Sequence, residues 1–186
     1  MTPQDFTLQE NLRGHELAFT TTYGLFSYKN IDDGTKLLID SVEFRDGDTI
    51  LDLGCGYGPI GIALAKDNPK GKVYMVDRDF IAVEYAKKNC ERNRLSNCEV
   101  LLSNGFSHLE GIQFNVIASN LPSHFSNDML EWMLQDAKNH LQSGGKLYVV
   151  TVSKLGKFIK REFESIFGNY EKVVHNRMYM ISSATK

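Results

Sequence analysis

The chain has 186 residues, of which 42% are hydrophobic, and its formal net charge is -2. This length and composition suit one domain of ordinary size with a single core, so we expect residues 1–186 to form one domain. The small net charge argues against a generally basic nucleic-acid-binding chain, and no run of about 18 apolar residues predicts a membrane-spanning helix.

The first residues of the chain indicate its cellular compartment, and the cysteine spacing indicates whether it binds a metal. Residues 1–5 lack the basic and apolar regions of a signal peptide, so we expect a cytoplasmic protein. Cys55, Cys90 and Cys98 form no Cys-x-x-Cys pair or Cys/His cluster. We therefore expect reduced thiols and no metal site, while the oligomeric state stays open.

The N-terminal part, residues 1–45, is predicted to contain a β-hairpin and a helix, ahead of a sheet formed by residues 46–186. Residues 15–27 read His-Glu-Leu-Ala-Phe-Thr-Thr-Thr-Tyr-Gly-Leu-Phe-Ser, and we interpret them as the hairpin. Residues 31–38 read as the start of the helix.

Residues 50–61 are the most informative stretch and read Ile-Leu-Asp-Leu-Gly-Cys-Gly-Tyr-Gly-Pro-Ile-Gly. They predict a buried strand that ends in a carboxylate, then a glycine-rich turn and a helix. Glycines at 54, 56 and 58 allow positive φ and let a ligand approach the backbone. Pro59 suits the first turn of a helix, so the ligand would lie at a helix N-terminus.

The same stretch matches the dinucleotide fingerprint Gly-x-Gly-x-x-Gly, which makes a nicotinamide or flavin enzyme an alternative. However, Asp52 lies two residues before the first glycine. A fixed negative charge there would repel a pyrophosphate and attract a cation. S-adenosylmethionine carries a sulfonium and an ammonium but no phosphate, so the sequence favours it.

The rest of the chain alternates strands and helices. We predict strands at 73–77, 98–102, 113–118 and 146–152, helices near 79–94, 126–142 and 155–167, and final strands at 171–175 and 177–182. This rhythm is typical of a mostly parallel α/β sheet that is covered on both faces. The short link at Asn176 makes the last two strands a hairpin, so one of them is antiparallel.

Residues 52–58, Asp-Leu-Gly-Cys-Gly-Tyr-Gly, resemble motif I of the class I S-adenosylmethionine-dependent methyltransferases. The resemblance implies a Rossmann-like fold with seven strands in the order 3-2-1-4-5-7-6. It also implies S-adenosylmethionine as cofactor, bound around the turn and the next strand end. Asp77 ends that strand, where an acid can accept both ribose hydroxyls, although an isolated Asp there would be read as a helix cap. The cofactor residues predicted in this part are Asp52, Gly54, Gly56, Tyr57, Gly58, Asp77 and Arg78.

A third cofactor element follows the strand at 98–102, where residues 103–106 read Ser-Asn-Gly-Phe. In the resembled pattern, the side chain at the place of Asn104 bonds the adenine amine and a nearby apolar residue covers the ring. We assign Asn104, Gly105 and Phe106 to this site. Asp is usual at the first of these positions, although the Asn oxygen can still accept; the alternative is a simple Asn-Gly turn.

Residues 117–125, Ile-Ala-Ser-Asn-Leu-Pro-Ser-His-Phe, stand at the position of motif IV. Amino-methyltransferases of this superfamily carry Asn-Pro-Pro and an aromatic residue there. The Asn oxygen and the next backbone carbonyl accept the two hydrogens of an exocyclic amine and aim its lone pair at the methyl group.

This chain departs from the motif IV pattern, because Leu121 replaces the first proline and Ser123 the aromatic residue. Asn120 and Pro122 remain. We predict Asn120, Leu121 and Pro122 as catalytic, with Asn120 also beside the cofactor. The alternative is a turn that serves other chemistry. The predicted substrate-binding residues are Ser123, His124 and Phe125, the last two of which could supply a ring.

Two further pieces, Gly-x-Phe-Ser at 24–27 and Asp-x-Gly-Thr at 32–35, resemble the methyltransferase small domain family. Its bacterial members methylate the exocyclic amine of guanine in ribosomal RNA and carry an additional N-terminal domain. The 186 residues here fit one domain of ordinary size, so we expect a single-domain form. The resemblance implies that Phe26 and Thr35 lie near the methionine end of the cofactor. Ordinary core packing is the alternative for Phe26.

These features together predict methyl transfer from S-adenosylmethionine to an exocyclic amine, with guanine in ribosomal or other structured RNA as the favoured substrate. A small-molecule or protein methyltransferase and a non-enzymatic cofactor-binding module remain as alternatives. The cations Lys154, Lys157, Lys160 and Arg161 recur at near-helical spacing. They form either a solvated helix face or a phosphate-binding patch.

Overall fold

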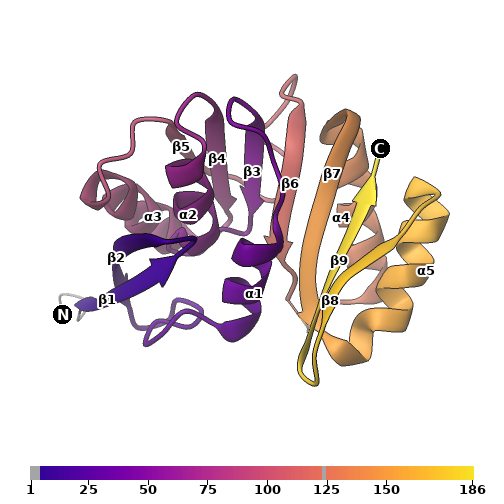
Figure 1. Ribbon diagram of the computed structural model, residues 1–186, viewed down its shortest axis with the longest axis horizontal. Coiled ribbons are helices and arrows are strands. Elements are labelled where there is room, and N and C mark those ends of the chain that lie inside the picture. Colours follow the sequence, from indigo (N-terminus) through magenta and orange to yellow (C-terminus); the bar gives the residue numbers. More distant parts are fainter. Residues whose placement is uncertain (1–4, 123–124) are drawn as a thin grey trace.

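A seven-stranded sheet organises the protein, whose computed structural model describes residues 5–122 and 125–186 (Figure 1). The strands of this sheet are β3 (Thr49–Leu53), β4 (Lys72–Asp77), β5 (Cys98–Leu102), β6 (Phe114–Asn120), β7 (Leu141–Val152), β8 (Glu171–His175) and β9 (Tyr179–Thr185). Their order is β5-β4-β3-β6-β7-β9-β8. Numbered within this sheet alone, the order is 3-2-1-4-5-7-6, as predicted. β9 runs antiparallel to both neighbours, and the other pairs are parallel.

Five helices cover the two faces of the sheet. One face carries α1 (Asp33–Ser41), α2 (Pro59–Asp67) and α3 (Phe80–Arg92), and the other carries α4 (Asn127–His140) and α5 (Gly156–Phe167). Successive strand residues point to opposite faces. Ile50 therefore packs in the core beneath α1 to α3, and Leu51 packs in the core beneath α4 and α5. The Rossmann-like α/β fold is confirmed.

The N-terminal hairpin differs from the prediction in its bounds. It pairs β1 (Asp5–Leu12) with β2 (His15–Thr22), and residues 23–27 form turns beyond it. The prediction of a hairpin within 15–27 was wrong because only the second strand lies there. The two connecting residues, Arg13 and Gly14, have φ of 52° and 79°, the geometry of a tight hairpin turn.

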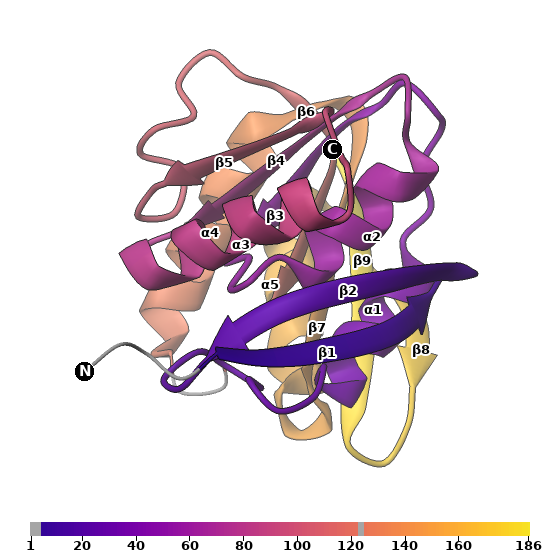
Figure 2. The ribbon, with the colours of Figure 1, turned by 90° about the vertical axis from the view of Figure 1, so that its left-hand side faces the viewer.

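Asn89 of α3 and Asn93, the C-cap of that helix, hold the hairpin on the α1 to α3 side of the sheet (Figure 2). The Asn93 side chain accepts from the Ala18 N–H at 3.0 Å and donates to the Ala18 carbonyl at 2.8 Å. Asn89, one helical turn earlier, makes the same pair of bonds with Thr20, at 2.6 and 2.9 Å. The two amides thus substitute for a neighbouring strand along the edge of β2.

Several other boundaries differ from those predicted. β7 begins at residue 141, directly after α4, and a 3₁₀ helix (Ser153–Leu155) precedes α5. The predicted strand at 177–182 instead spans 179–185, because the Asn176 side chain accepts from the N–H groups of Met178 and Tyr179, at 2.8 and 2.7 Å, and turns the chain. None of the described helices is both long and apolar enough to cross a membrane.

Candidate active site

The carboxyl ends of β3, β4, β5 and β6 meet at one edge of the sheet, where ligands of open α/β sheets bind. The glycine turn, Asp77, the 103–106 segment and Asn120 all lie at these strand ends. The topology therefore brings the predicted cofactor and catalytic residues to a common edge. Ser123 and His124 lie outside the described residues.

The glycine turn is held by backbone contacts with β4. Gly54, Gly56 and Gly58 have φ of 76°, 56° and 93°, values that residues with a Cβ seldom adopt. The N–H groups of Gly54 and Cys55 both donate to the Val76 carbonyl at 2.9 Å. The turn therefore has a fixed position and presents a surface without side chains at the start of α2.

Gly61, the last glycine of the fingerprint, has a packing role. A Cβ at this position would lie 2.3 Å from Met75 Cγ, so α2 can approach β4 closely only with a glycine here. The dinucleotide-like spacing is therefore explained in part by helix–sheet packing rather than by a pyrophosphate.

Asp52 is fully buried beneath the turn. Its Oδ2 accepts from the Gly61 N–H at 2.8 Å, and no described residue donates to its Oδ1. Burial raises the pKa of this carboxyl to about 7; the bond from Gly61 opposes the shift and the charge of Asp77 adds to it. An ionised Asp52 thus lacks a compensating positive charge, which a cationic ligand on the turn would provide through its field.

Asp77 joins the glycine turn to the start of α3. One carboxyl oxygen accepts from the Gly56 N–H at 2.9 Å, and the other accepts from the Asp79 N–H at 2.9 Å. A carboxylate offers about four acceptor positions, so two remain for hydroxyl donors. The neighbouring Arg78 is exposed.

The predicted adenine side differs in detail from the sequence pattern. Asn104 is exposed after β5, but Phe106 is 7% exposed and stacks on His140, with 4.5 Å between ring centroids. Leu102 and Phe80 lie at the same edge and are 47% and 59% exposed. Sequence reasoning missed these two apolar side chains, although Leu102 is the last residue of β5 and Phe80 begins α3 three residues after the end of β4.

Asn120 is held by side chains from the N-terminal part. Its Nδ2 donates to Thr35 Oγ1 at 2.9 Å and to Asp32 Oδ2 at 3.3 Å. An ionised carboxylate can only accept, so the amide nitrogen must face Asp32. Its oxygen points the other way, and no described residue donates to it or to the backbone carbonyl of Leu121.

Contacts with Tyr179, at the start of β9, explain why the Asp-x-Gly-Thr segment has an aspartate and a glycine at these positions. The Tyr179 hydroxyl donates to Asp32 Oδ1 at 2.8 Å, and its ring leaves so little space that a Cβ on Gly34 would lie 2.7 Å from Cδ1. The hydrogen bond to Asp32 is the main cause that raises the pKa of Tyr179 to about 12, with burial and the charges of Asp32 and Asp33 adding to it. Sequence reasoning missed both Asp32 and Tyr179 as site residues.

The Gly-x-Phe-Ser segment lies against the glycine turn. The Tyr57 side chain is buried and donates to the Ser27 carbonyl at 3.3 Å. Phe26 is 66% exposed, so the alternative of ordinary core packing for this residue is wrong. The tyrosine thus positions the segment, and the phenylalanine is free to meet a ligand.

The segment after Asn120 is tied to the sheet and to α4. The Leu121 side chain is buried, and its N–H donates to the Val150 carbonyl at 3.1 Å. Phe125 is half-buried against the core beneath α4 and α5. Pro122 is also half-buried, and its carbonyl accepts from the Phe125 N–H at 3.3 Å.

Among the residues that the structure describes, no group of three or more His, Cys, Asp or Glu could hold a metal ion.

Comparison with known proteins assigns the family. The methyltransferase small domain profile matches residues 16–183. The chain belongs to the methyltransferase small domain family. A Bacillus subtilis (strain 168) relative, described as uncharacterized protein YbxB, is 35% identical over 178 residues, which are 94% of this chain and 89% of YbxB. Methyltransferases of this family use S-adenosylmethionine, so the predicted cofactor is confirmed at the level of the family.

Solved structures of other methyltransferases are similar to this chain. The T. thermophilus 16S rRNA N2 methyltransferase RsmC, in complex with AdoMet and guanosine, superimposes with a TM-score of 0.87 and 26% identity. The match covers 98% of this chain but 50% of RsmC, so the chain spans half the length of that protein. A precorrin-6y C5,15-methyltransferase from Geobacter metallireducens, 14% identical, has a TM-score of 0.72 over 90% of this chain and 95% of its own, which shows the shared fold.

Proposed function

We propose that this member of the methyltransferase small domain family transfers a methyl group from S-adenosylmethionine to the exocyclic amine of guanine in structured RNA. The observation that carries the proposal is the fixed orientation of Asn120, whose amide nitrogen faces Asp32 and Thr35. This orientation leaves the amide oxygen, together with the Leu121 carbonyl, to accept the two hydrogens of a flat amine.

The two acceptors have a defined chemical role. When both amine hydrogens point at the Asn120 oxygen and the Leu121 carbonyl, the nitrogen lone pair is aimed away from them. Orientation of this kind lowers the barrier to an in-line transfer. The same two oxygens stabilise the positive charge that develops on the amine nitrogen, so the chain needs no strong general base.

The residues at the sheet edge fit the proposed cofactor. The turn at Gly54, Gly56 and Gly58 offers backbone without side chains, Asp52 supplies an uncompensated negative charge, and Asp77 keeps two acceptor positions. Asn104 and Gly105 would bind the adenine, with Phe106 or the more exposed Leu102 beside the ring. Phe26 and Thr35 would lie at the methionine end. When bound, S-adenosylmethionine supplies an electrophilic methyl group.

The RNA substrate is supported by the RsmC similarity, because that protein's structure contains guanosine. Phe125 follows the proposed catalytic residues Asn120, Leu121 and Pro122, and Ser123 and His124, which are outside the described residues, complete the proposed substrate contacts. The two departures from the motif IV pattern, Leu121 and Ser123, leave Asn120 and the following carbonyl in place.

The direct test is methyl transfer from radiolabelled S-adenosylmethionine into total RNA from cells that lack this protein, followed by nuclease digestion and nucleoside analysis. We expect label in methylguanosine with the wild type, loss of label with Asn120→Ala, and full label with Asn11→Ala, which changes an exposed hairpin asparagine. Label confined to protein or small amines would contradict the RNA assignment. Cofactor binding without any transfer would contradict the enzymatic one.

A further inference from the structure

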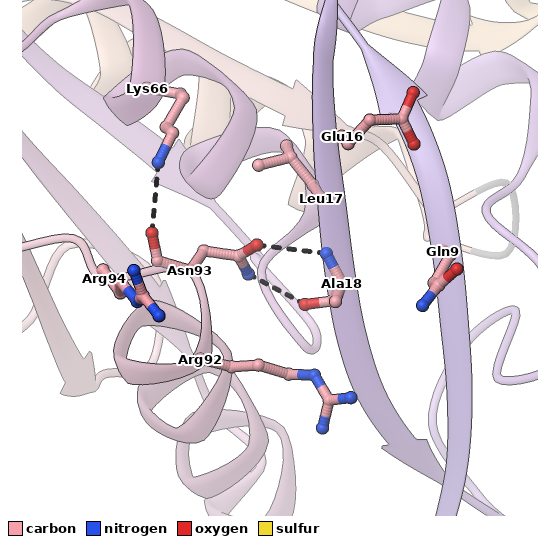
Figure 3. A pocket seen from close by; sticks show the side chains of 8 residues that line it. All are labelled: Gln9, Glu16, Leu17, Ala18, Lys66, Arg92, Asn93 and Arg94. Atoms are coloured by element: carbon pink, nitrogen blue, oxygen red, sulfur yellow. Dashed lines mark hydrogen bonds between the residues drawn. The ribbon is translucent and has the colours of Figure 1, made fainter.

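A cationic cavity lies between the hairpin and the ends of α2 and α3, away from the proposed active site (Figure 3). Its volume is about 320 Å³, and its lining includes Lys66, Arg92 and Arg94, with Glu16 as the one acid among the lining residues. Three cations and one carboxylate leave the cavity with a net positive charge.

The cavity is separate from the methyl-transfer edge. α2 and α3 begin at the glycine turn and just after Asp77, and Lys66 and Arg92 lie at the opposite ends of these helices. α3 has 13 residues, which at 1.5 Å per residue places the two regions roughly 20 Å apart. A small substrate cannot span this distance, but a structured RNA can.

The floor of the cavity is fixed. The Asn93 side chain bonds both backbone groups of Ala18, and the Asn93 backbone carbonyl accepts from Lys66 Nζ at 3.2 Å (Figure 3). Arg92 Nη1 donates to Thr20 Oγ1 at 3.3 Å. Two of the three cations are therefore anchored by neutral oxygens, so their charge is retained for a ligand.

Two other cations near the hairpin have acidic partners. Arg13 pairs with Asp67, and Lys36 pairs with Glu10. Within residues 5–122 and 125–186, Lys66, Arg92 and Arg94 make no ion pair.

Arg94 also occupies an unfavourable backbone conformation. Its φ is 55°, at the end of α3 where its N–H donates to the Glu91 carbonyl at 2.9 Å. Glycine is the usual residue at this left-handed helix-ending position. An arginine at this position is less stable than a glycine, and this strain supports a function for the Arg94 side chain.

The other basic surface, on α5, is less suited to an anion. Arg161 Nη2 lies 2.6 Å from Glu162, and Lys160 lies 3.7 Å from Glu164. These pairs compensate two of the three cations of α5 and favour the interpretation of this part of the helix as a solvated face.

We propose that this cavity binds a backbone phosphate of the RNA substrate, through Arg92, Arg94 and Lys66, while the target base lies at Asn120. The proposal rests on the proposed function, because it assigns a second contact for the same RNA. It gives a chain with a net charge of -2 a local cluster of three cations that an RNA phosphate can contact.

The test compares two variants that each remove two positive charges. Arg92→Ala/Arg94→Gly alters the cavity, and Lys87→Ala/Lys160→Ala removes two exposed cations that pair with Glu84 and Glu164, as the matched control. With the cavity variant we expect the KM for RNA to rise about tenfold, kcat and cofactor affinity to stay unchanged, and the slope of log affinity against log salt to fall by about 1, as for the loss of one phosphate contact. The control should change KM by less than about twofold, in line with the small contribution of compensated surface charges.

A stability measurement separates binding from folding. Arg94→Gly alone should raise the melting temperature, because glycine tolerates this φ, and should still raise the KM for RNA. A purely structural arginine would give the gain in stability without the loss of affinity. Equal changes in KM for the cavity variant and the control, or none for either, would overturn the proposal.

A second experiment tests the phosphate site even if the proposed methyl transfer to RNA is not observed. If wild-type protein transfers no methyl group to any RNA, the cavity is tested with inorganic phosphate, by following the amide signals of Ala18 and Asn93 in NMR titrations. Phosphate-dependent shifts that Arg92→Ala/Arg94→Gly abolishes would sustain a phosphate site, and no shifts with the wild type would exclude it.

Discussion

The amide nitrogen of Asn120 lies 2.9 Å from Thr35 Oγ1, so a residue of the fourth strand of the large sheet is oriented by the first turn of α1, 85 positions earlier in the chain. Asp32, the N-cap of α1, accepts from the same nitrogen. The N-terminal segment therefore belongs to the catalytic arrangement as well as to the fold.

Asp32→Asn tests how Asn120 is oriented. Asparagine is as good an N-cap as aspartate, so α1 and the thermal stability should be preserved. An amide in place of the carboxylate can donate as well as accept, so it no longer forces the Asn120 nitrogen to face it. We expect kcat to fall about tenfold, the loss of roughly one positioning hydrogen bond, with cofactor affinity unchanged. An unaltered kcat in steady-state assays would exclude this role of Asp32.

Tyr179→Phe removes the hydroxyl that bonds Asp32 and leaves the ring over Gly34. We expect a smaller loss of kcat than for Asp32→Asn, because Asp32 keeps its bonds to Asn120 and to the Thr35 N–H. Since the pKa of Tyr179 is raised to about 12, the phenol stays protonated up to pH 10, and the defect should be constant across that range. The paired measurement is the pH profile of kcat for both variants; a pH-dependent difference would contradict the assignment.

Gly34→Ala should damage the same contact from the other side. The new Cβ would lie 2.7 Å from the Tyr179 ring, and overpacking of this kind costs about 1–3 kcal/mol. We expect a lower midpoint of urea unfolding and a reduced kcat. Gly14→Ala provides a steric comparison, since nothing lies within 4 Å of a Cβ there. It should lose stability through its φ of 79° alone and retain kcat.

The sequence predicted those parts of the site whose residues are close together in the chain. The strand, the turn and the helix start around Asp52 follow one another directly, so local pattern was sufficient. The bond between Tyr179 and Asp32 joins residues 147 positions apart, and it exists because β9 inserts beside β7, under α1. No local pattern reports that juxtaposition.

The other differences from the sequence prediction also have physical causes. The first strand of the hairpin was missed because its turn uses Arg13 rather than the usual Asn or Asp before a glycine. Phe106 was assigned to the cofactor from the resembled pattern after β5, and this role stays a prediction; its ring stacks on His140 of α4, a partner that sequence alone did not identify.

The stability of the cofactor-free protein should depend on pH because of the buried Asp52 carboxyl. Its pKa is raised from 3.8 to about 7, so between these values the folded state binds more protons than the unfolded state. The contribution of Asp52 to stability is therefore complete below about pH 4 and is lost as the pH rises towards 7, by up to about 4 kcal/mol. In urea unfolding at pH 5 to 8, the free energy of unfolding of Asp52→Asn should increase relative to that of the wild type as the pH rises. The same pH dependence for both proteins would contradict this expectation.

Binding of S-adenosylmethionine should show the opposite trend with pH at the same residue. A cation on the glycine turn favours the ionised carboxylate, so affinity increases as Asp52 ionises. With a pKa of about 7, the ionised fraction rises roughly tenfold between pH 6 and pH 8, and we expect the affinity of the wild type to rise by the same factor. Asp52→Asn should bind more weakly at pH 8, with a shallower pH dependence. Calorimetric titrations of both proteins at the two pH values provide the measurement, and equal slopes would show that Asp52 does not act on the cofactor through its charge.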